Sequence, residues 1–296
     1  MKVALTGATG FIGSHVLTEL HGRGHEVIGL VRNDAEADQV AGAGGTPTVV
    51  DLYDRPAVVD ILRGVDGAIH TASPGDATSA NLDAAVVDAV LESFAGTGNP
   101  YLQISGLWTY GNNPAITEES PLDPPAFVSW KVPIERRVLA EENMRGVVIV
   151  SGTAYGDGGG GIPGLLLGSP RDDDGNLIML GTGEQRWSTV HVADLADLFG
   201  RVLEDKAASG RFIVSDGTHP TVAELTEAAA VAAGAPGAVP GSDDEARARL
   251  GDAFAEVLLL DQGTAADKAR AELDWQPTRP SLVEEFTNGS YRTSTG

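Results

Sequence analysis

Short runs of β-branched and aliphatic residues alternate with helical patterns through the first half of the chain. The runs that predict strands cover residues 2–6, 26–31, 48–50, 67–71, 101–105 and 147–150. Between them, apolar positions recur at helical spacing over residues 12–21, 54–62, 81–94 and 134–142. Strands that alternate with helices of this length are typical of βαβ units. The pattern therefore predicts an α/β protein built on a doubly wound parallel sheet.

The pattern changes after Ser151. A glycine-rich stretch runs from Gly156 to Gly161, and a polar insertion follows around residues 171–176. One further strand is predicted at residues 211–214 and one alanine-rich helix at residues 222–233. Loops of this kind more often shape a substrate site than a core.

Length and charge narrow the class of protein. A chain of 296 residues predicts one large domain or two unequal ones. Its formal net charge of -22 argues against nucleic acid as a partner, because nucleic-acid binders concentrate Lys and Arg into a basic stripe. We expect no membrane association, since Gly, Asp or Arg interrupts every apolar run before it reaches ~20 residues.

The N-terminus and the cysteine content bear on location. Met1 to Leu5 leads directly into the first predicted strand and leaves no room for a secretory signal peptide. The chain has no cysteine, so thiolate chemistry and disulfides are excluded. We expect a cytoplasmic protein, and the candidate residues include no metal site.

Three glycines stand at three-residue spacing between the first strand and the first helix. They are Gly7, Gly10 and Gly13. A cofactor pyrophosphate needs a backbone that turns tightly, approaches without a Cβ atom, and directs free N–H groups from a helix N-terminus. The spacing and the context therefore predict a dinucleotide site whose first loop also includes Thr9, Phe11 and Ile12.

This motif resembles that of the extended short-chain dehydrogenase/reductases, relatives of the sugar epimerases and dehydratases. The likeness continues through Tyr110-Gly111, Tyr155-Gly156, residues 190–196 and residues 273–277. It implies a Rossmann domain over residues 1–155 and 187–215. It also implies a smaller C-terminal substrate-binding domain over residues 156–186 and 216–296 that closes over a small-molecule substrate. A homodimer is compatible with this interpretation.

The end of the second strand indicates which dinucleotide binds. An acidic residue there would bind the adenosine ribose and repel a 2′-phosphate. The chain has Val31 at that position and Arg32 after it, which favours NADP over NAD. An ion pair between Arg32 and Asp34 is the structural alternative. The resemblance implies further cofactor contacts at Asp51, Leu52, Thr71, Ala72, Ser73, Asn81 and Ser105.

Two catalytic positions of the family are changed. The resemblance implies a tyrosine four residues before a lysine, and the chain has Phe127 before Lys131. It also implies a serine or threonine four residues before Tyr110, and the chain has Gly106 there. We expect Lys131 to bind the cofactor ribose and Glu135 to pair with Lys131. Pro133 predicts a kink in the helix that carries them.

Other side chains are candidates for the missing proton donor. They are Tyr155, which we favour, and Tyr110, Ser129 and His191, of which His191 is also a candidate loop anchor. The sequence predicts an NADP-dependent oxidoreductase that acts on a small carbonyl or alcohol by hydride transfer with a non-standard proton donor. An epimerase or dehydratase that uses the cofactor transiently, and a non-catalytic NADP-binding regulator, are the alternatives.

Overall fold

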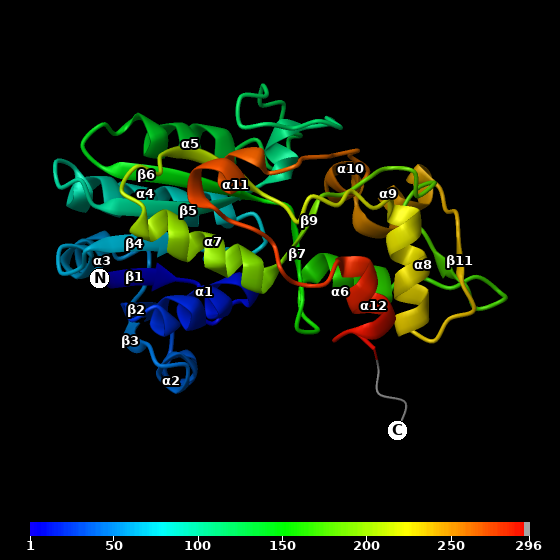
Figure 1. Ribbon diagram of the computed structural model, residues 1–296, viewed down its shortest axis with the longest axis horizontal. Coiled ribbons are helices and arrows are strands. Elements are labelled where there is room, and N and C mark those ends of the chain that lie inside the picture. Colours follow the sequence, from blue (N-terminus) through cyan, green and yellow to red (C-terminus); the bar gives the residue numbers. More distant parts are fainter. Residues whose placement is uncertain (293–296) are drawn as a thin grey trace.

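The computed structural model describes residues 1–292 and has a seven-stranded parallel sheet at its centre (Figure 1). The strand order is β10-β6-β5-β4-β1-β2-β3. The strands are β1 (Lys2–Thr6), β2 (Glu26–Val31), β3 (Thr46–Val49), β4 (Gly67–His70), β5 (Pro100–Gly106), β6 (Arg145–Ser151) and β10 (Gly210–Val214). Because the chain order reverses beside β1, the predicted doubly wound Rossmann sheet is confirmed.

Helices cover both faces of this sheet and bury an apolar layer on each (Figure 1). The helices of the first face are α1 (Phe11–Gly22), α2 (Asp34–Gly42), α7 (Val192–Glu204) and α11 (Asp267–Leu273). Those of the second face are α3 (Arg55–Leu62), α4 (Ser79–Phe94) and α5 (Lys131–Ala140). Parallel strands buried on both faces read as continuous apolar runs, which is why the sequence predicted them well.

Helices α2 and α5, which flank the sheet, differ from the prediction. Helix α2 was not predicted, because Val40 is its one buried residue and its apolar period is weak. Helix α5 begins at Lys131, so Pro133 lies in its first turn. An N–H in that turn has no partner within the helix, and a proline there costs no hydrogen bond. The predicted kink at Pro133 was therefore wrong.

A third apolar cluster lies beyond the carboxyl end of the sheet. Two small parallel pairs belong to this part, namely β7 (Thr153–Tyr155) with β9 (Thr189–His191), and β8 (Leu177–Ile178) with β11 (Ala238–Val239). Its helices are α6 (Gly161–Leu167), α8 (Val222–Ala232), α9 (Asp243–Leu250), α10 (Asp252–Leu258) and α12 (Leu282–Asn288). The exact domain boundaries stay a prediction, and residues 293–296 of the predicted smaller domain lie outside the described residues.

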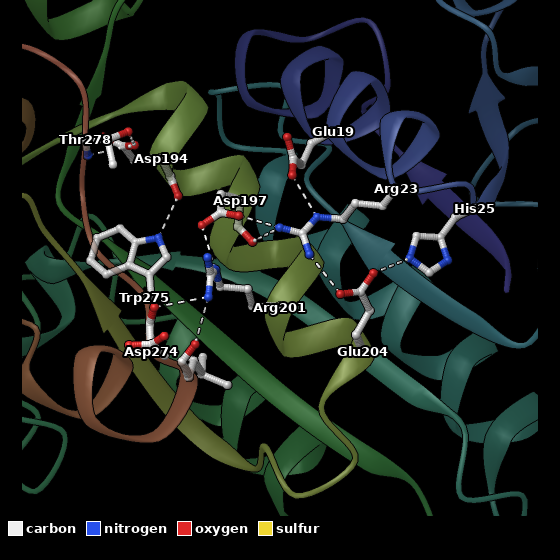
Figure 2. Close-up of polar contacts among 11 residues, drawn as sticks. Glu19, Arg23, His25, Asp194, Asp197, Arg201, Glu204, Asp274, Trp275 and Thr278 are labelled. Carbon is white, nitrogen blue, oxygen red and sulfur yellow. Dashed lines mark hydrogen bonds and ion pairs between the residues drawn. The ribbon is translucent and has the colours of Figure 1, made fainter.

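The chain returns from this part to the first face of the sheet. Trp275 is fully buried there, and its indole Nε1 donates to the Asp194 carbonyl at 3.0 Å. Figure 2 shows the polar contacts around it, in which Arg201 donates to the carbonyls of Leu273 and Asp274. Arg23, the residue that follows α1, pairs with Asp197 of α7 in the same network. Segments distant in the sequence thus share one layer.

No helix in the described part of the chain is both long and apolar enough to cross a membrane.

Candidate functional site

The three glycines form a closely packed turn where β1 meets α1. Gly7 has a φ of +71°, and a Cβ atom there would lie 2.6 Å from the Ala72 backbone nitrogen. At Gly13 a Cβ atom would collide with the Gly7 carbonyl and lie 2.7 Å from Thr71 Oγ1. These positions exclude side chains because β1, β4 and α1 converge on them. The first N–H groups of a helix have no partner within it, and the crevice beside β1, where α1 begins, is where this fold binds a pyrophosphate.

The loop after β4 forms the other wall of the crevice. Thr71 Oγ1 donates to the Thr6 carbonyl at 2.8 Å, and Ala72 N donates to Thr6 Oγ1 at 3.4 Å. Ser73 is exposed and its hydroxyl lies 3.4 Å from that of Ser79. The other residues expected near the cofactor are Asp51, which is exposed, Leu52, which is half-buried, and Asn81, which is exposed in the first turn of α4.

Arg32 is paired with Glu36, and not with Asp34 as in the structural alternative. Its Nε donates to Glu36 Oε1 at 3.0 Å, and its backbone N–H donates to Glu36 Oε2 at 3.0 Å. The guanidinium holds the pKa of Glu36 below its usual range. Arg32 remains 81% exposed at the carboxyl end of β2. The guanidinium therefore faces solvent at the predicted ribose position, with a carboxylate already bound to it.

Lys131 is held by a buried carboxylate on α4. Its Nζ lies 3.6 Å from Asp83 Oδ2. Asp83 also contacts His70 Nε2 at 3.1 Å and accepts a hydrogen bond from Gln103 at 3.3 Å. Burial by itself raises the pKa of Asp83. The hydrogen bond from His70 and the interactions with His70 and Lys131 outweigh this effect, so the pKa lies below its usual value. The prediction that Lys131 pairs with Glu135 was wrong.

Glu135 instead belongs to a second buried group. Ser105 Oγ donates to Glu135 Oε1 at 2.5 Å, and Arg211 donates to Glu135 Oε2 at 3.0 Å. Glu135 is 1% exposed, so the Arg211 guanidinium supplies the charge that balances it. The single hydrogen of the Ser105 hydroxyl is therefore used inside the protein.

The two changed catalytic positions are filled differently. Phe127 is 40% exposed, and its ring packs against Phe254 of α10 and Trp108 at centroid distances of 5.6 Å and 6.4 Å. Gly106 has extended backbone angles, and a Cβ atom there would meet its nearest neighbour, the Ser151 carbonyl, at 3.9 Å. The tyrosine position is thus occupied by a phenylalanine ring in contact with other aromatic rings, and the serine position leaves open space.

Tyr155, the favoured replacement donor, is fully buried in the third apolar cluster. Its hydroxyl donates to the Pro280 carbonyl at 2.8 Å and lies 3.2 Å from Asp216 Oδ2. Burial, together with the Asp216 carboxylate, raises the pKa of Tyr155 far above its usual value. The geometry contradicts a proton-donor role and gives Tyr155 a structural one.

The remaining donor candidates lie in three different settings. His191 is buried, its Nδ1 accepts from Ala193 N as the N-cap of α7, and burial lowers its pKa. Ser129 is exposed and donates to the Ala126 carbonyl at 3.1 Å. Tyr110 ends the short helix η1 (Leu107–Tyr110), and within residues 1–292 its buried hydroxyl has no hydrogen-bond partner. Burial raises the pKa of Tyr110 to about 12. The structure does not bring these groups together.

Sequence reasoning missed Asp83, His70 and Glu36. One signal was present for Asp83, because it interrupts the apolar face of α4 between Leu82 and Val86. An acid on a buried helix face needs a partner. For Glu36 the signal was its position in the first turn of a helix that was not predicted.

A cavity of about 220 Å³ lies at the carboxyl ends of β5 and β6. Residues from both strands, from α1, from η1 and from the third cluster line it, among them Ile12, Ser105, Gly106, Trp108 and Trp187. Ligands of open α/β sheets bind outside the carboxyl ends of the strands. The cavity and the glycine turn therefore share the edge of the sheet at which this fold binds ligands.

Several known proteins are similar to this chain. An uncharacterized protein of Schizosaccharomyces pombe is 28% identical over 297 residues, which cover 98% of this chain and 100% of that protein. A 3-diazoavenalumate denitrifying reductase of a Streptomyces species is 28% identical over 313 residues, which cover 95% of this chain and 97% of that protein. The human epimerase family protein SDR39U1, solved with NADPH, superposes with a TM-score of 0.76 at 22% identity, over 98% of this chain and 99% of that one.

The family follows from a match to a family model over more than half of the chain. The model of the NAD dependent epimerase/dehydratase family covers residues 3–214, which span the whole seven-stranded sheet and the glycine turn. The sheet order, the turn and this match agree, and the chain belongs to the NAD dependent epimerase/dehydratase family.

Proposed function

We propose that this protein is an NADP-dependent oxidoreductase that transfers hydride between the cofactor and a small carbonyl or alcohol, with no protein side chain as proton donor. The observation that carries the proposal is the glycine turn beside Arg32. Gly7 and Gly13 leave no room for a Cβ atom at the pyrophosphate position. Val31 stands where an acid would favour NAD, and Arg32, the next residue, offers an exposed guanidinium.

The residues around the crevice fit a nicotinamide dinucleotide. The first N–H groups of α1 would hold the pyrophosphate, Lys131 the nicotinamide ribose, and Arg32 the 2′-phosphate. The cofactor, when bound, supplies or accepts the hydride. Asp83 holds the Lys131 ammonium in place, because the two groups lie 3.6 Å apart and both side chains are largely buried.

In the direction of reduction, we assign the proton to solvent. Phe127 has no proton to give, Gly106 has no hydroxyl, and the hydrogen of Ser105 is bound to Glu135. A carbonyl carbon that accepts hydride leaves its oxygen with the bonding pair, and that oxygen then takes a proton from water. Proximity and orientation alone can lower a barrier by ~7–11 kcal/mol, so the loss of the tyrosine leaves room for catalysis.

The relatives support the choice of reaction class. The similar Streptomyces protein is a reductase by name, and the similar human protein was solved with NADPH. These names describe those proteins, and we extend the reaction class and the cofactor to this chain as part of the proposal.

Calorimetric titration with NADPH and NADH, followed by mixing of the NADPH complex with a panel of carbonyl compounds, tests the proposal. We expect NADPH to bind at least about tenfold more tightly than NADH, a difference of ~1.4 kcal/mol. We also expect the absorbance of NADPH to fall when one of the carbonyl compounds is added, because hydride transfer oxidises the cofactor. An isomerised sugar nucleotide with no net oxidation would establish the epimerase alternative. A bound cofactor that never changes redox state would favour a regulator.

A further inference from the structure

The cavity at the ends of β5 and β6 has a lining without a charged side chain. Within the described residues, its wall consists of apolar and neutral polar groups. The larger apolar members are Ile12, Ile104, Leu107, Trp108, Ile162 and Trp187. Recognition of a diphosphate or carboxylate needs cationic side chains or several free N–H groups. This wall offers no Arg or Lys, and the net charge of -22 opposes anions further.

Several polar side chains of the wall donate their hydrogens to groups of the protein. Ser105 donates to Glu135 at 2.5 Å, and Ser151 Oγ donates to the Gly152 carbonyl at 2.7 Å. Both hydrogens of the Gln262 amide bind carbonyls, those of Leu107 and Gly111, each at 2.7 Å.

Trp187 behaves in the same way, since its Nε1 donates to the Leu258 carbonyl at 3.2 Å. A sugar presents many hydroxyl groups, and each that loses water needs a new partner. With these four side chains already bound, the wall suits an apolar molecule better than a sugar, although the hydroxyls of Thr153 and Ser188 also line it.

Aromatic rings continue outward from this wall. Trp108 lines the cavity and contacts Phe127 and Phe254, with ring centroids 6.4 Å and 6.2 Å away. Phe127 and Phe254 are themselves 5.6 Å apart. Edge-to-face and tilted contacts of this kind add to the free energy of apolar burial. The residue that replaced the family's tyrosine therefore extends an apolar surface from the cavity to solvent.

We infer that this cavity binds the reacting part of a neutral, largely apolar carbonyl compound, of the aryl ketone class, rather than a nucleotide sugar. The inference rests on the proposed function, because it names the substrate class for the same site. A volume of about 220 Å³ is below the ~300–1,000 Å³ of most ligand pockets, so only a small portion of a larger substrate would enter.

Binding of 2-acetylnaphthalene, a neutral aryl ketone, tests the inference. Its affinity is measured by quenching of tryptophan fluorescence and by calorimetry, with and without saturating NADP⁺, against 2-naphthoate and UDP-glucose as charged comparators. We expect the ketone to bind at least tenfold more tightly than 2-naphthoate, and UDP-glucose to show no saturable binding. Tighter binding of UDP-glucose or of 2-naphthoate would overturn the inference, as would no saturable binding of the ketone.

Two variants locate the binding. Gly106→Leu fills the open space beside the Ser151 carbonyl, so it should weaken ketone binding at least tenfold. Gly42→Leu, at a position where a Cβ atom meets nothing within 4 Å, is the matched control and should leave it unchanged. Equal ketone affinity in wild type and a folded Gly106→Leu would place the ligand elsewhere and refute the inference.

A second pair keeps the test decisive if Gly106→Leu does not fold. Ile162 and Leu165 are both half-buried residues of α6, but only Ile162 lines the cavity. Ile162→Ala should weaken ketone binding several-fold and Leu165→Ala should not, and equal effects would contradict the inference. The cofactor titration separates the two proposals. Ketone binding without NADPH binding would sink the proposed function alone, and NADPH binding without ketone binding would sink this inference alone.

Discussion

The Lys131 ammonium and the Asp83 carboxylate face each other at 3.6 Å across the gap between α5 and α4. The Asp83 side chain is 3% exposed, and the Lys131 side chain is 19% exposed. A chain of contacts continues from Asp83 through His70 to the Thr6 hydroxyl at the end of β1, where Thr6 Oγ1 lies 2.6 Å from His70 Nδ1. The lysine that we assign to the ribose is thus fixed by groups that reach the strand of the glycine turn.

Replacement of Asp83 should affect stability and cofactor binding together. Asp83→Asn leaves the Lys131 ammonium without its balancing charge, and breaking a buried ion pair from one side costs ~3–5 kcal/mol. We expect a lower free energy of unfolding in urea and weaker NADPH binding by calorimetry. Asp88→Asn, on the same helix, removes exposed pairs with Arg137 and Arg55 and should change stability by about 1 kcal/mol or less.

The pH dependence supplies a further check on Asp83. Its pKa is lowered in the folded protein, so its contribution to stability is complete above the unfolded value of about 4. That contribution is lost as the pH falls through the lower folded value. The difference in stability between wild type and Asp83→Asn should therefore be constant near neutral pH and narrow below pH ~4. A gap that stays constant in acid would mean that the carboxylate charge is not what matters.

Glu36 should limit the selectivity for NADPH. Its carboxylate already accepts hydrogen bonds from the Arg32 backbone and side chain, so a 2′-phosphate must share Arg32 with a resident negative charge. We expect Glu36→Gln to raise the ratio of NADPH affinity to NADH affinity about two- to fivefold. We expect Arg32→Ala to abolish the preference for NADPH. Glu19→Gln breaks the comparable pair with Arg23 on α1 and should leave the ratio unchanged. A ratio that falls in Glu36→Gln would show that Glu36 orients Arg32 instead.

Tyr155→Phe should cost stability rather than catalysis. The change removes one oxygen and leaves the Pro280 carbonyl and the Asp216 carboxylate with one partner fewer in a part-buried setting, a loss of ~1 kcal/mol. We expect a lower unfolding midpoint, with cofactor affinity and turnover at permissive temperature unchanged. Tyr53→Phe, at a tyrosine that is 52% exposed, serves as control. A loss of turnover of about a hundredfold at full stability would restore Tyr155 as a proton donor.

The family's catalytic hydroxyls should be restorable. Gly106 has extended backbone and open space for a side chain, and Phe127 is partly exposed, so Gly106→Ser and Phe127→Tyr should both be tolerated. If the site transfers hydride, the double variant should reduce aryl ketones at least ~10-fold faster, since a positioned general acid contributes ~10²- to 10⁴-fold. Gly146→Ser is a control for stability, because a Cβ atom there collides with the Val138 carbonyl. A folded double variant with unchanged or slower turnover would contradict this prediction.

The sheet was predictable because buried parallel strands carry their signal in consecutive apolar residues. The predicted run 26–31 coincides with β2, and the predicted run 67–71 extends one residue beyond β4. Helix α2 was missed because one buried residue, Val40, gives no period. The start of α5 was misplaced because a proline in the first turn reads in sequence like a proline in the interior.

In the site, too, local features were predictable from the sequence and long-range contacts were not. The glycine turn was predictable because its requirements are those of local backbone geometry. Side-chain partners were not, because Lys131 meets Asp83 and Ser105 meets Glu135 only after α4, α5 and β5 have packed. Tyr155 was misjudged for the same reason, since Pro280 and Asp216 reach its hydroxyl from distant parts of the chain.

The return of Trp275 to the first face of the sheet sets a limit on how the protein can be made. Residues 3–214, which match the family model, do not complete their own apolar layer, because Ala269, Leu273 and Trp275 supply part of it. A ribosome that adds ~5–20 residues per second needs roughly 3–12 seconds to reach Trp275 after Val214 has been made. During that interval the surface of α7 that Trp275 later covers stands bare. We therefore expect a fragment cut after Val214 to aggregate rather than fold.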